Sequence, residues 1–255
     1  MDNIRIIPEY AKTKDDIWSE VFESLETPSG KKVFFRHLPI WAYAASFLIP
    51  VFLTGLFYTK TIETAKGEHT HFKLPDHSII ALNAESKASY NPFKWFFSRI
   101  VQLEGEAYFE VKHGNRFIVQ SGINRVNVLG TKFNVYARSG VYSVTCLEGK
   151  VEVYAESGSI VLHSNMQATL RVPQFSIKND VSTSIATGWM QGRFVFDETP
   201  LREVIAEIER QYNIKVVPMT YPNHPYSGNF FKTDEPGKLL EAIGTPFGIK
   251  FRIEE

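Results

Sequence analysis

The sequence predicts a chain of mixed fold class: an N-terminal helix, a single transmembrane helix, an all-β domain folded as a sandwich or β-roll, and a small α+β domain with a double βαβ plan. Three observations predict this order. They are an uncharged run at 38–58, short alternating or β-branched stretches between 68 and 172, and a strand, helix, strand pattern that occurs twice between 193 and 253. We therefore expect four parts, residues 1–37, 38–58, 68–173 and 188–255.

Composition limits what these parts can do. The 255 residues carry 28 Lys and Arg and 28 Asp and Glu, so the chain has no basic excess with which to bind nucleic acid directly. An apolar fraction of 44% is enough for packed cores. The single cysteine, Cys146, excludes an internal disulfide and a four-thiolate zinc site.

Residues 14–26 predict an amphipathic helix in the N-terminal tail, with Thr13 at the N-cap position. Its polar face is acidic, so an anionic membrane surface would repel it, whereas a basic groove on a protein suits it. The helix is too short to bury its apolar stripe internally, and a solvated, frayed helix is the alternative. The residues predicted to contact a partner are Ile17, Trp18, Val21, Phe22 and Leu25.

The segment from Leu38 to Tyr58 predicts the transmembrane helix. Its 21 residues carry no charge and as a helix would span about 31 Å, which matches a bilayer core. Pro50 at the midpoint predicts a kink. A buried core helix is the alternative. Positive charge is nearly balanced on the two sides, so the charge rule does not decide the orientation.

The stretches between Glu68 and Val172 predict an all-β domain, because turn signals such as His113-Gly114-Asn115 and Ser157-Gly158 separate them at strand-like spacing. We expect strands at 116–121, 126–130, 131–137, 141–147 and 150–155, and a loop at 91–97 that packs on the sheet.

The C-terminal part predicts two similar halves. In the first, Thr199 caps a helix with Pro200 at its first position, and a strand begins at Ile214. The second half repeats this plan from Ser227 to Ile253. An exposed strand edge in such a domain is a template for pairing with a strand of another chain.

Signatures of catalysis are missing. The sequence has no nucleophile elbow, phosphate-binding loop, dinucleotide fingerprint or paired metal-ligand motif, so we expect no enzyme, no cofactor and no metal site. We expect His69, His71 and His77 to be ordinary surface histidines rather than metal ligands. We expect Glu104, Glu106 and Glu110 to lie on a solvated strand face. We expect the Cys146 side chain to pack in a core.

Gly130-Thr131 is the exception with possible chemistry. A threonine hydroxyl directly after a strained glycine can attack the preceding carbonyl and form an ester that water opens. The alternative, a glycine bend between two strands, is the interpretation that the sequence favours.

With these pieces in place, the chain resembles the FecR family of single-pass anti-sigma regulators, in particular its Bacteroides-type branch. The blocks LPDHSIIALNAESKASY, VQLEGEAYFEVKHG, VNVLGTKFNVYAR, CLEGKVEV, FDETPLREVIAEIERQYNIKV and YSGNFFKTDEPGKLLEAIGTPFGIKF follow one another in family order. Each block alone is a packing motif, and their succession is specific.

The resemblance implies an inner-membrane protein with a cytoplasmic tail that holds an extracytoplasmic-function sigma factor. It also implies a periplasmic body that receives a signal from a TonB-dependent outer-membrane transporter, whose N-terminal signalling domain the double βαβ part resembles. In relatives from other bacteria the Gly-Thr matching Gly130-Thr131 is a self-cleavage point. Two departures stand out: the tail is far shorter than in better-known members, and His77 stands where many relatives have glycine.

A rival function from a different class is a membrane-tethered periplasmic glycan-binding module. It is favoured by the β domain and by aromatic residues such as Tyr90, Phe93 and Trp95. The sequence does not identify the sigma factor, the transporter, the inducing nutrient or the oligomeric state.

Overall fold

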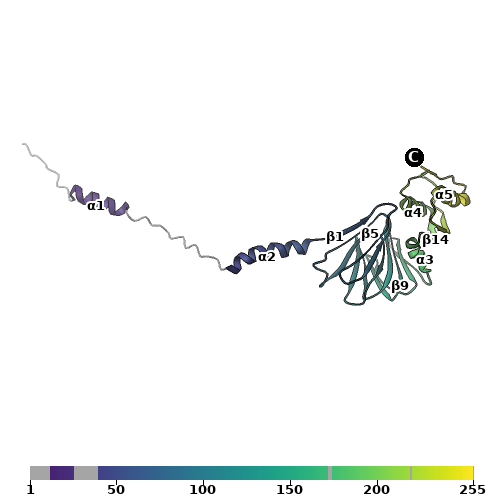
Figure 1. Cartoon of the computed structure of the whole chain (residues 1–255), viewed down its shortest axis with the longest axis horizontal. Helices are drawn as coiled ribbons and strands as arrows, with labels where there is room; N and C mark the ends of the chain where they lie inside the picture. Colours follow the sequence, from purple (N-terminus) through teal and green to yellow (C-terminus); the bar gives the residue numbers. More distant parts are fainter. Residues whose placement is uncertain (1–11, 26–39, 172–173, 219, 255) are drawn as a thin grey trace, which may run out of the picture. The chain divides into compact units, whose positions relative to one another are not determined.

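The computed structural model of the chain describes residues 12–25, 40–171, 174–218 and 220–254 (Figure 1). Contacts divide the chain into two compact units, Met1–Ile49 and Pro50–Glu255. In the first unit the structure describes α1 (Lys14–Leu25) and the start of α2 (Ile40–Phe57). α1 lies where the sequence predicts the tail helix, and Asp15 and Asp16 in its first turn complement the helix dipole.

α2 falls within the segment predicted to cross a membrane, and Pro50 lies inside it. Among the residues that the structure describes, no helix is long and apolar enough to span a bilayer, so the predicted transmembrane helix is not found. The last turn contacts the β domain, where the Asn91 amide donates to the carbonyl of Leu56 (2.8 Å).

Thirteen strands form the sheet of the second unit, and most of them lie in one path with the order β11-β10-β7-β6-β5-β8-β9-β12-β13. β1 pairs with β4, and both β3 and β4 pair with β5. The strands are β1 (Lys60–Thr64), β2 (Thr70–Lys73), β3 (Ile79–Leu82), β4 (Ser86–Tyr90), β5 (Arg99–Glu110), β6 (Phe117–Ser121), β7 (Asn124–Val128), β8 (Lys132–Arg138), β9 (Val141–Glu148), β10 (Lys150–Ala155), β11 (Gly158–His163), β12 (Met166–Arg171) and β13 (Gln174–Lys178).

The long strand β5 joins the two halves of this sheet. Its first half pairs with β4 and β6, and its second half pairs with β3 and β8. Gly105 lies at the change with φ +96°, and a Cβ there would lie 2.8 Å from the Cα of Ser86. Only glycine fits this position, because both the backbone conformation and the close approach of β4 exclude a side chain.

Alternating apolar residues of these strands form the core. Phe109 of β5 stacks on Phe133 of β8 at 4.9 Å between ring centroids, and its edge meets Phe117 of β6 at 6.2 Å. All three side chains are fully buried. Burial of such rings stabilises the fold by about 2 kcal/mol each, so the three rings contribute to a core that strands of both halves of the sheet share.

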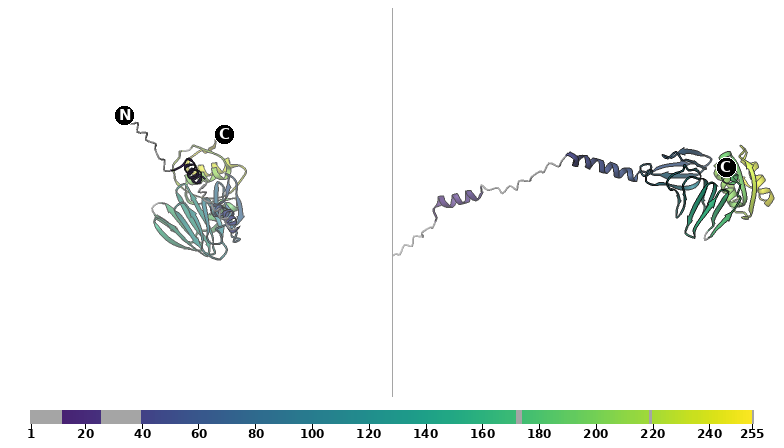
Figure 2. Two further views of the ribbon diagram at one scale, coloured as in Figure 1. Left: turned by 90° about the vertical axis from the view of Figure 1, so that its left-hand side faces the viewer. Right: turned by 90° about the horizontal axis from the view of Figure 1, so that it is seen from below.

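The C-terminal part begins with two short helices, α3 (Thr183–Thr187) and η1 (Gly188–Gln191). It continues with β14 (Arg193–Pro200), α4 (Leu201–Tyr212), β15 (Val216–Val217), β16 (Pro225–Phe231), α5 (Pro236–Gly244), η2 (Thr245–Phe247) and β17 (Arg252–Ile253). The predicted apolar stripe of α4 is buried in one core with apolar side chains of β14, β16 and α5. Helices α3, α4 and α5 lie together at one side of the large sheet (Figures 1 and 2).

The predicted mixed class is wrong, because strands dominate the described residues and the helices are few and short. The double βαβ plan also needs correction. β14 pairs antiparallel with β16, and β15 pairs antiparallel with β17, so each pair takes one strand from each half. Local strand and helix signals do not specify this pairing, which depends on contacts between the halves. Pro200 is the N-cap of α4 rather than its first helical residue.

Candidate functional site

The tail helix α1 presents its apolar stripe to solvent. The side chains of Ile17, Trp18, Val21 and Phe22 are between 41% and 57% exposed, and the side chain of Leu25 lies outside the described residues. The rings of Trp18 and Phe22 are 5.9 Å apart. An exposed row of large apolar side chains at helical spacing is the form in which a helix enters a partner's groove.

The start of α1 is fixed by a reciprocal cap. The backbone N–H of Asp16 donates to the Thr13 hydroxyl, and the hydroxyl and backbone N–H of Thr13 both donate to the Asp16 carboxylate. These hydrogen bonds from Thr13 lower the pKa of Asp16, so the carboxylate stays charged. The last turn carries no basic residue, so the described helix presents an acidic polar face beside its apolar stripe.

A second candidate region is a buried polar cluster where the large sheet meets α4. The carboxylate of Glu106 in β5 accepts hydrogen bonds from the amides of Asn83 (2.7 Å) and Asn134 (2.9 Å). Burial, and next the charge of Glu207 in α4, raise the pKa of Glu106 to about 7. The prediction of a solvated acidic face is wrong for Glu106, because α4 covers it.

The side chains that α4 contributes complete this cluster. Gln211 donates to the Asn83 carbonyl oxygen (2.6 Å) and to Glu207 (2.8 Å). Arg210 forms ion pairs with Glu207 and with Glu85, which follows β3. Arg210 and Gln211 are both buried. The cluster therefore joins parts of the chain 128 positions apart through hydrogen bonds rather than through apolar packing.

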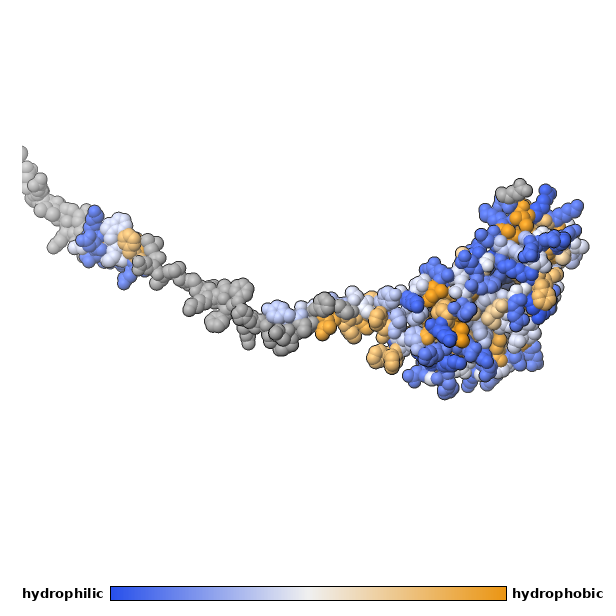
Figure 3. Space-filling view, in the orientation of Figure 1, coloured by the Kyte–Doolittle hydropathy of each residue, from blue (hydrophilic) through white to orange (hydrophobic). Residues whose placement is uncertain are grey.

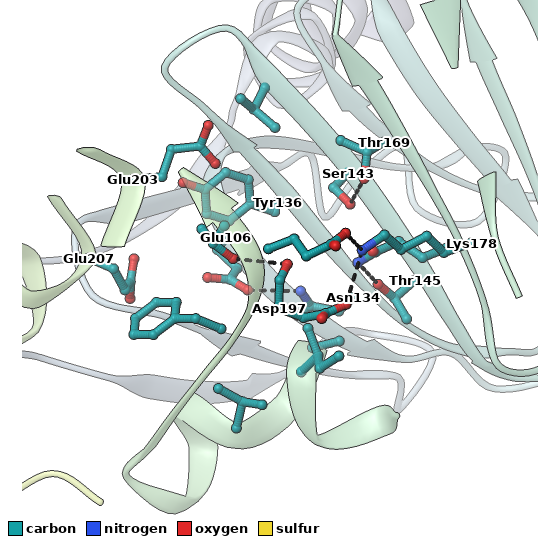
Figure 4. A pocket seen from close by; sticks show the side chains of 18 of the residues that line it. Glu106, Asn134, Tyr136, Ser143, Thr145, Thr169, Lys178, Asp197, Glu203 and Glu207 are labelled. Carbon is teal, nitrogen blue, oxygen red and sulfur yellow. Dashed lines mark hydrogen bonds and ion pairs between the residues drawn. The ribbon is translucent and has the colours of Figure 1, made fainter. Parts of the chain in front are cut away.

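A pocket of about 370 Å³ opens beside the cluster, between the polar face of the sheet and the C-terminal part (Figure 4). Cross-strand pairs of hydroxyl and amide groups form its floor: Ser143 with Thr169 at 3.0 Å, and Thr145 with Gln167 at 2.9 Å. The ion pair of Lys178 with Asp197 lies at its edge (3.0 Å). Charged side chains such as Arg171, Arg193 and Glu203 also line the pocket, so it offers hydrogen bonds and charged groups to a polar molecule, and its volume fits the range of small-ligand pockets.

In the described part of the chain, no group of three or more His, Cys, Asp or Glu side chains comes together in a way that could hold a metal ion. His69 contacts Gln211 at 2.9 Å, and burial lowers its pKa, so its neutral form is favoured. His71 is exposed. His77 takes a left-handed φ of 64° in the turn before β3, a conformation that glycine adopts readily.

Gly130 and Thr131 lie between β7 and β8. The Thr131 hydroxyl donates to the carbonyl of Lys150 (3.0 Å), and the Thr131 carbonyl accepts from the N–H of Val111 (3.0 Å). A Cβ at Gly130 would lie 2.8 Å from the Cα of His113. This close approach gives a structural reason for the glycine, and cleavage after Gly130 stays the alternative hypothesis to a glycine bend.

The remaining sequence candidates are mostly core residues. Cys146 is buried, and burial raises its pKa to about 11, which fits packing rather than thiolate chemistry. Tyr90 and Trp95, two of the aromatic residues that favoured a glycan-binding module, are buried and in contact with each other at 5.3 Å. Of that trio, Phe93 alone is exposed.

Comparisons with known proteins agree with one another. The FecR protein family matches residues 60–152, and the family of FecR C-terminal domains matches residues 193–255. A crystal structure of a proposed anti-sigma factor from Parabacteroides distasonis ATCC 8503, at 2.50 Å resolution, is 32% identical with a TM-score of 0.71, over 78% of this chain and 96% of that one. The chain belongs to the FecR family.

A second crystal structure of a proposed anti-sigma factor from the same organism, at 1.65 Å resolution, is 33% identical with a TM-score of 0.70, over 77% of this chain and 95% of that one. A search of curated proteins finds no match. The FecR family and these relatives give the chain an anti-sigma role, with a sigma factor as its partner.

The polar cluster connects the two FecR-family regions. Asn83 and Glu106 belong to the first region, and Glu207, Arg210 and Gln211 belong to the C-terminal one. Sequence reasoning missed these α4 residues, because polar positions opposite an apolar stripe look like a solvated helix face. No local signal marks them, because Gly105 indicates a close approach of β4 to β5 and does not point to α4.

Proposed function

We propose that this FecR-family anti-sigma factor holds an extracytoplasmic-function sigma factor with α1. The observation that carries the proposal is the exposed apolar stripe of α1 beside an acidic face. Sigma factors bind the DNA backbone with basic surfaces, so an acidic helix with a central aromatic pair complements such a surface.

Co-purification of the full chain with the sigma factors of its cell tests this proposal. Trp18→Ala and Phe22→Ala each remove one ring of the exposed pair, and we expect each to weaken sigma binding by about 2 kcal/mol, roughly 30-fold. Ser19→Ala, on the same helix, is the matched control and retains binding. A chain that retains no sigma factor, or aromatic variants that bind like the unmodified chain, would contradict the proposal.

We also propose that the body receives its signal from the N-terminal signalling domain of a TonB-dependent outer-membrane transporter. The support is the C-terminal part, where β14 and β16 pair only with each other in the described ladders. Unpaired strand edges accept a strand from a second protein. Adding the signalling domain should slow hydrogen exchange in β14 or β16, and slowing confined to other elements would refute edge pairing.

The proposed location is the inner membrane, with the tail in the cytoplasm and the body in the periplasm. Selective labelling tests it, because the one native cysteine is buried. We expect a membrane-impermeant thiol reagent to reach Ser157→Cys in the body once the outer membrane is permeabilised, and to miss Ser24→Cys in the tail. Equal labelling of both positions would refute the location.

A second candidate function is glycan binding by the body, which the hydroxyl and amide groups on the floor of the pocket favour. Calorimetric titration of the full chain with oligosaccharides decides this candidate. Saturable binding that Thr145→Val and Thr169→Val abolish would support it, and the absence of binding would remove it.

A further inference from the structure

Exposed aromatic side chains gather at one place on the second unit. Five of them are between 52% and 94% exposed and lie where the end of α2 meets the loop between β4 and β5. Figure 3 shows apolar side chains along the end of α2 and at its junction with the sheet. We call this group the aromatic patch: Phe57, Tyr58, Phe93, Phe96 and Phe97.

The loop that carries the aromatic patch is held in place from inside. Trp95 is buried and packs edge-on against Tyr90 (5.3 Å) and Phe117 (5.8 Å). Because Trp95 points into the core, its neighbours Phe96 and Phe97 project outward and are more than nine-tenths exposed. Their exposure is therefore a consequence of an ordered loop.

The patch is continuous with the end of α2. The Asn91 side chain accepts hydrogen bonds from the N–H groups of Phe93 and Lys94, and its amide donates to the carbonyl of Leu56. The Phe93 ring lies 3.7 Å from the position of a Cβ at Gly55 and 5.8 Å from the ring of Tyr58. One asparagine thus fixes the apolar helix end and the aromatic loop to each other.

The two chain segments that carry the patch contain basic residues and no acidic ones. Residues 50–62 and 86–103 contain no Asp or Glu. Lys94 lies 5.8 Å from the centroid of the Phe57 ring, and Lys60 follows at the start of β1. Aromatic rings with nearby lysines are the composition of protein surfaces at the headgroup level of a bilayer, where rings enter the interface and ammonium groups meet lipid phosphates.

Outside α2, the other large exposed apolar side chains of the second unit include Ile123 in the β6–β7 turn, and single exposed apolar residues of this kind are ordinary on protein surfaces. A contiguous exposed aromatic patch on an ordered loop indicates a surface that a binding partner or a membrane covers. We propose that the aromatic patch lies in the interfacial region of a phospholipid bilayer and fixes the orientation of the β domain at the membrane surface. This inference rests on the proposed location of the body at the membrane.

The experiment uses the full chain in vesicles of phosphatidylethanolamine and phosphatidylglycerol. An environment-sensitive fluorophore is attached at Ser98→Cys, which leaves every aromatic ring intact, or at Ile123→Cys as the distant control. Cys146 is buried and its raised pKa disfavours the thiolate, so the reagent labels the introduced cysteine. Spin-labelled acyl chains in the vesicles report contact with lipid, and iodide reports contact with water.

We expect lipid quenching at position 98 to exceed that at position 123 at least threefold, and to fall to the control level in Phe96→Ser/Phe97→Ser. Equal iodide access at both positions would overturn the inference. Shielding of position 98 only when another protein or a second copy is added, without lipid quenching, would overturn it too. Flotation of the chain with the vesicles is measured on the same samples: a chain that floats without lipid quenching at position 98 overturns this inference alone, whereas a chain that does not float contradicts the proposed location.

Discussion

Replacement of Glu106 by glutamine tests the buried polar cluster most sharply. The Glu106 carboxyl has an ordinary pKa of 4.5 and a folded-state pKa of about 7, raised by burial and then by Glu207. Between these values the folded chain keeps a proton that the unfolded chain releases, so stability is full below pH 4.5 and is lost as the pH rises through 7. A shift from 4.5 to about 7 corresponds to about 3 kcal/mol.

Glu106→Gln is neutral at every pH and keeps a similar shape. The side-chain carbonyl oxygen of Asn134 is buried and has no hydrogen-bond partner among the described atoms. If the Asn134 side-chain amide rotates by 180°, this oxygen can accept a hydrogen bond from the new amide at position 106. We therefore expect the difference in unfolding free energy, variant minus unmodified chain, to rise by about 3 kcal/mol between pH 4.5 and pH 8.

Urea unfolding across that pH range measures this difference. Glu104→Gln, which removes one carboxylate at an exposed position of the same strand, is the matched control. If the curves for Glu106→Gln and the unmodified chain run parallel from pH 4.5 to pH 8, Glu106 does not hold a proton in the folded state and the reasoning is refuted.

Three further predictions follow from named contacts. Gly105→Ala should lower the unfolding free energy by about 2 kcal/mol or more, because the new Cβ clashes with β4 and the backbone has a positive φ. Gly140→Ala is the control: its φ is +75° but the space around it is open, so it should lower the unfolding free energy by about 1 kcal/mol. Urea unfolding midpoints compare the two variants. Gln211→Ala removes the 2.6 Å hydrogen bond to Asn83, so it should lower the unfolding free energy by about 1–3 kcal/mol and speed hydrogen exchange in α4. Unchanged exchange in α4 would contradict the link between the two FecR regions. If the chain cuts itself after Gly130, a gel of the unmodified protein shows two fragments and Thr131→Ala shows one band; we expect one band from both.

The local elements of the fold could be predicted from the sequence. β6, β8, β9 and β10 lie within about a residue or two of the predicted strands, because period-two alternation and turn glycines are local signals. The stripe of α4 could be predicted for the same reason. Sheet pairing in the C-terminal part could not, since two similar halves offer several pairings and only packing between them selects one.

The buried cluster could not be predicted because its partners are distant in sequence. Glu106 looks like a solvent-facing acid among Glu104 and Glu110, and nothing near it shows that α4 will cover it. The five predicted contact residues in the tail lie on a helix that local periodicity could predict, and their contact with a partner stays a prediction.

One measurement tests the anti-sigma role most directly. A photo-crosslinking amino acid replaces Trp18 in the full chain, and the crosslinked product formed in living cells is identified by mass spectrometry. We predict a crosslink from position 18 to a sigma factor, and loss of that crosslink when Phe22→Ala is added. Crosslinks from position 18 that never include a sigma factor, while the chain is present at its normal level, would contradict the account.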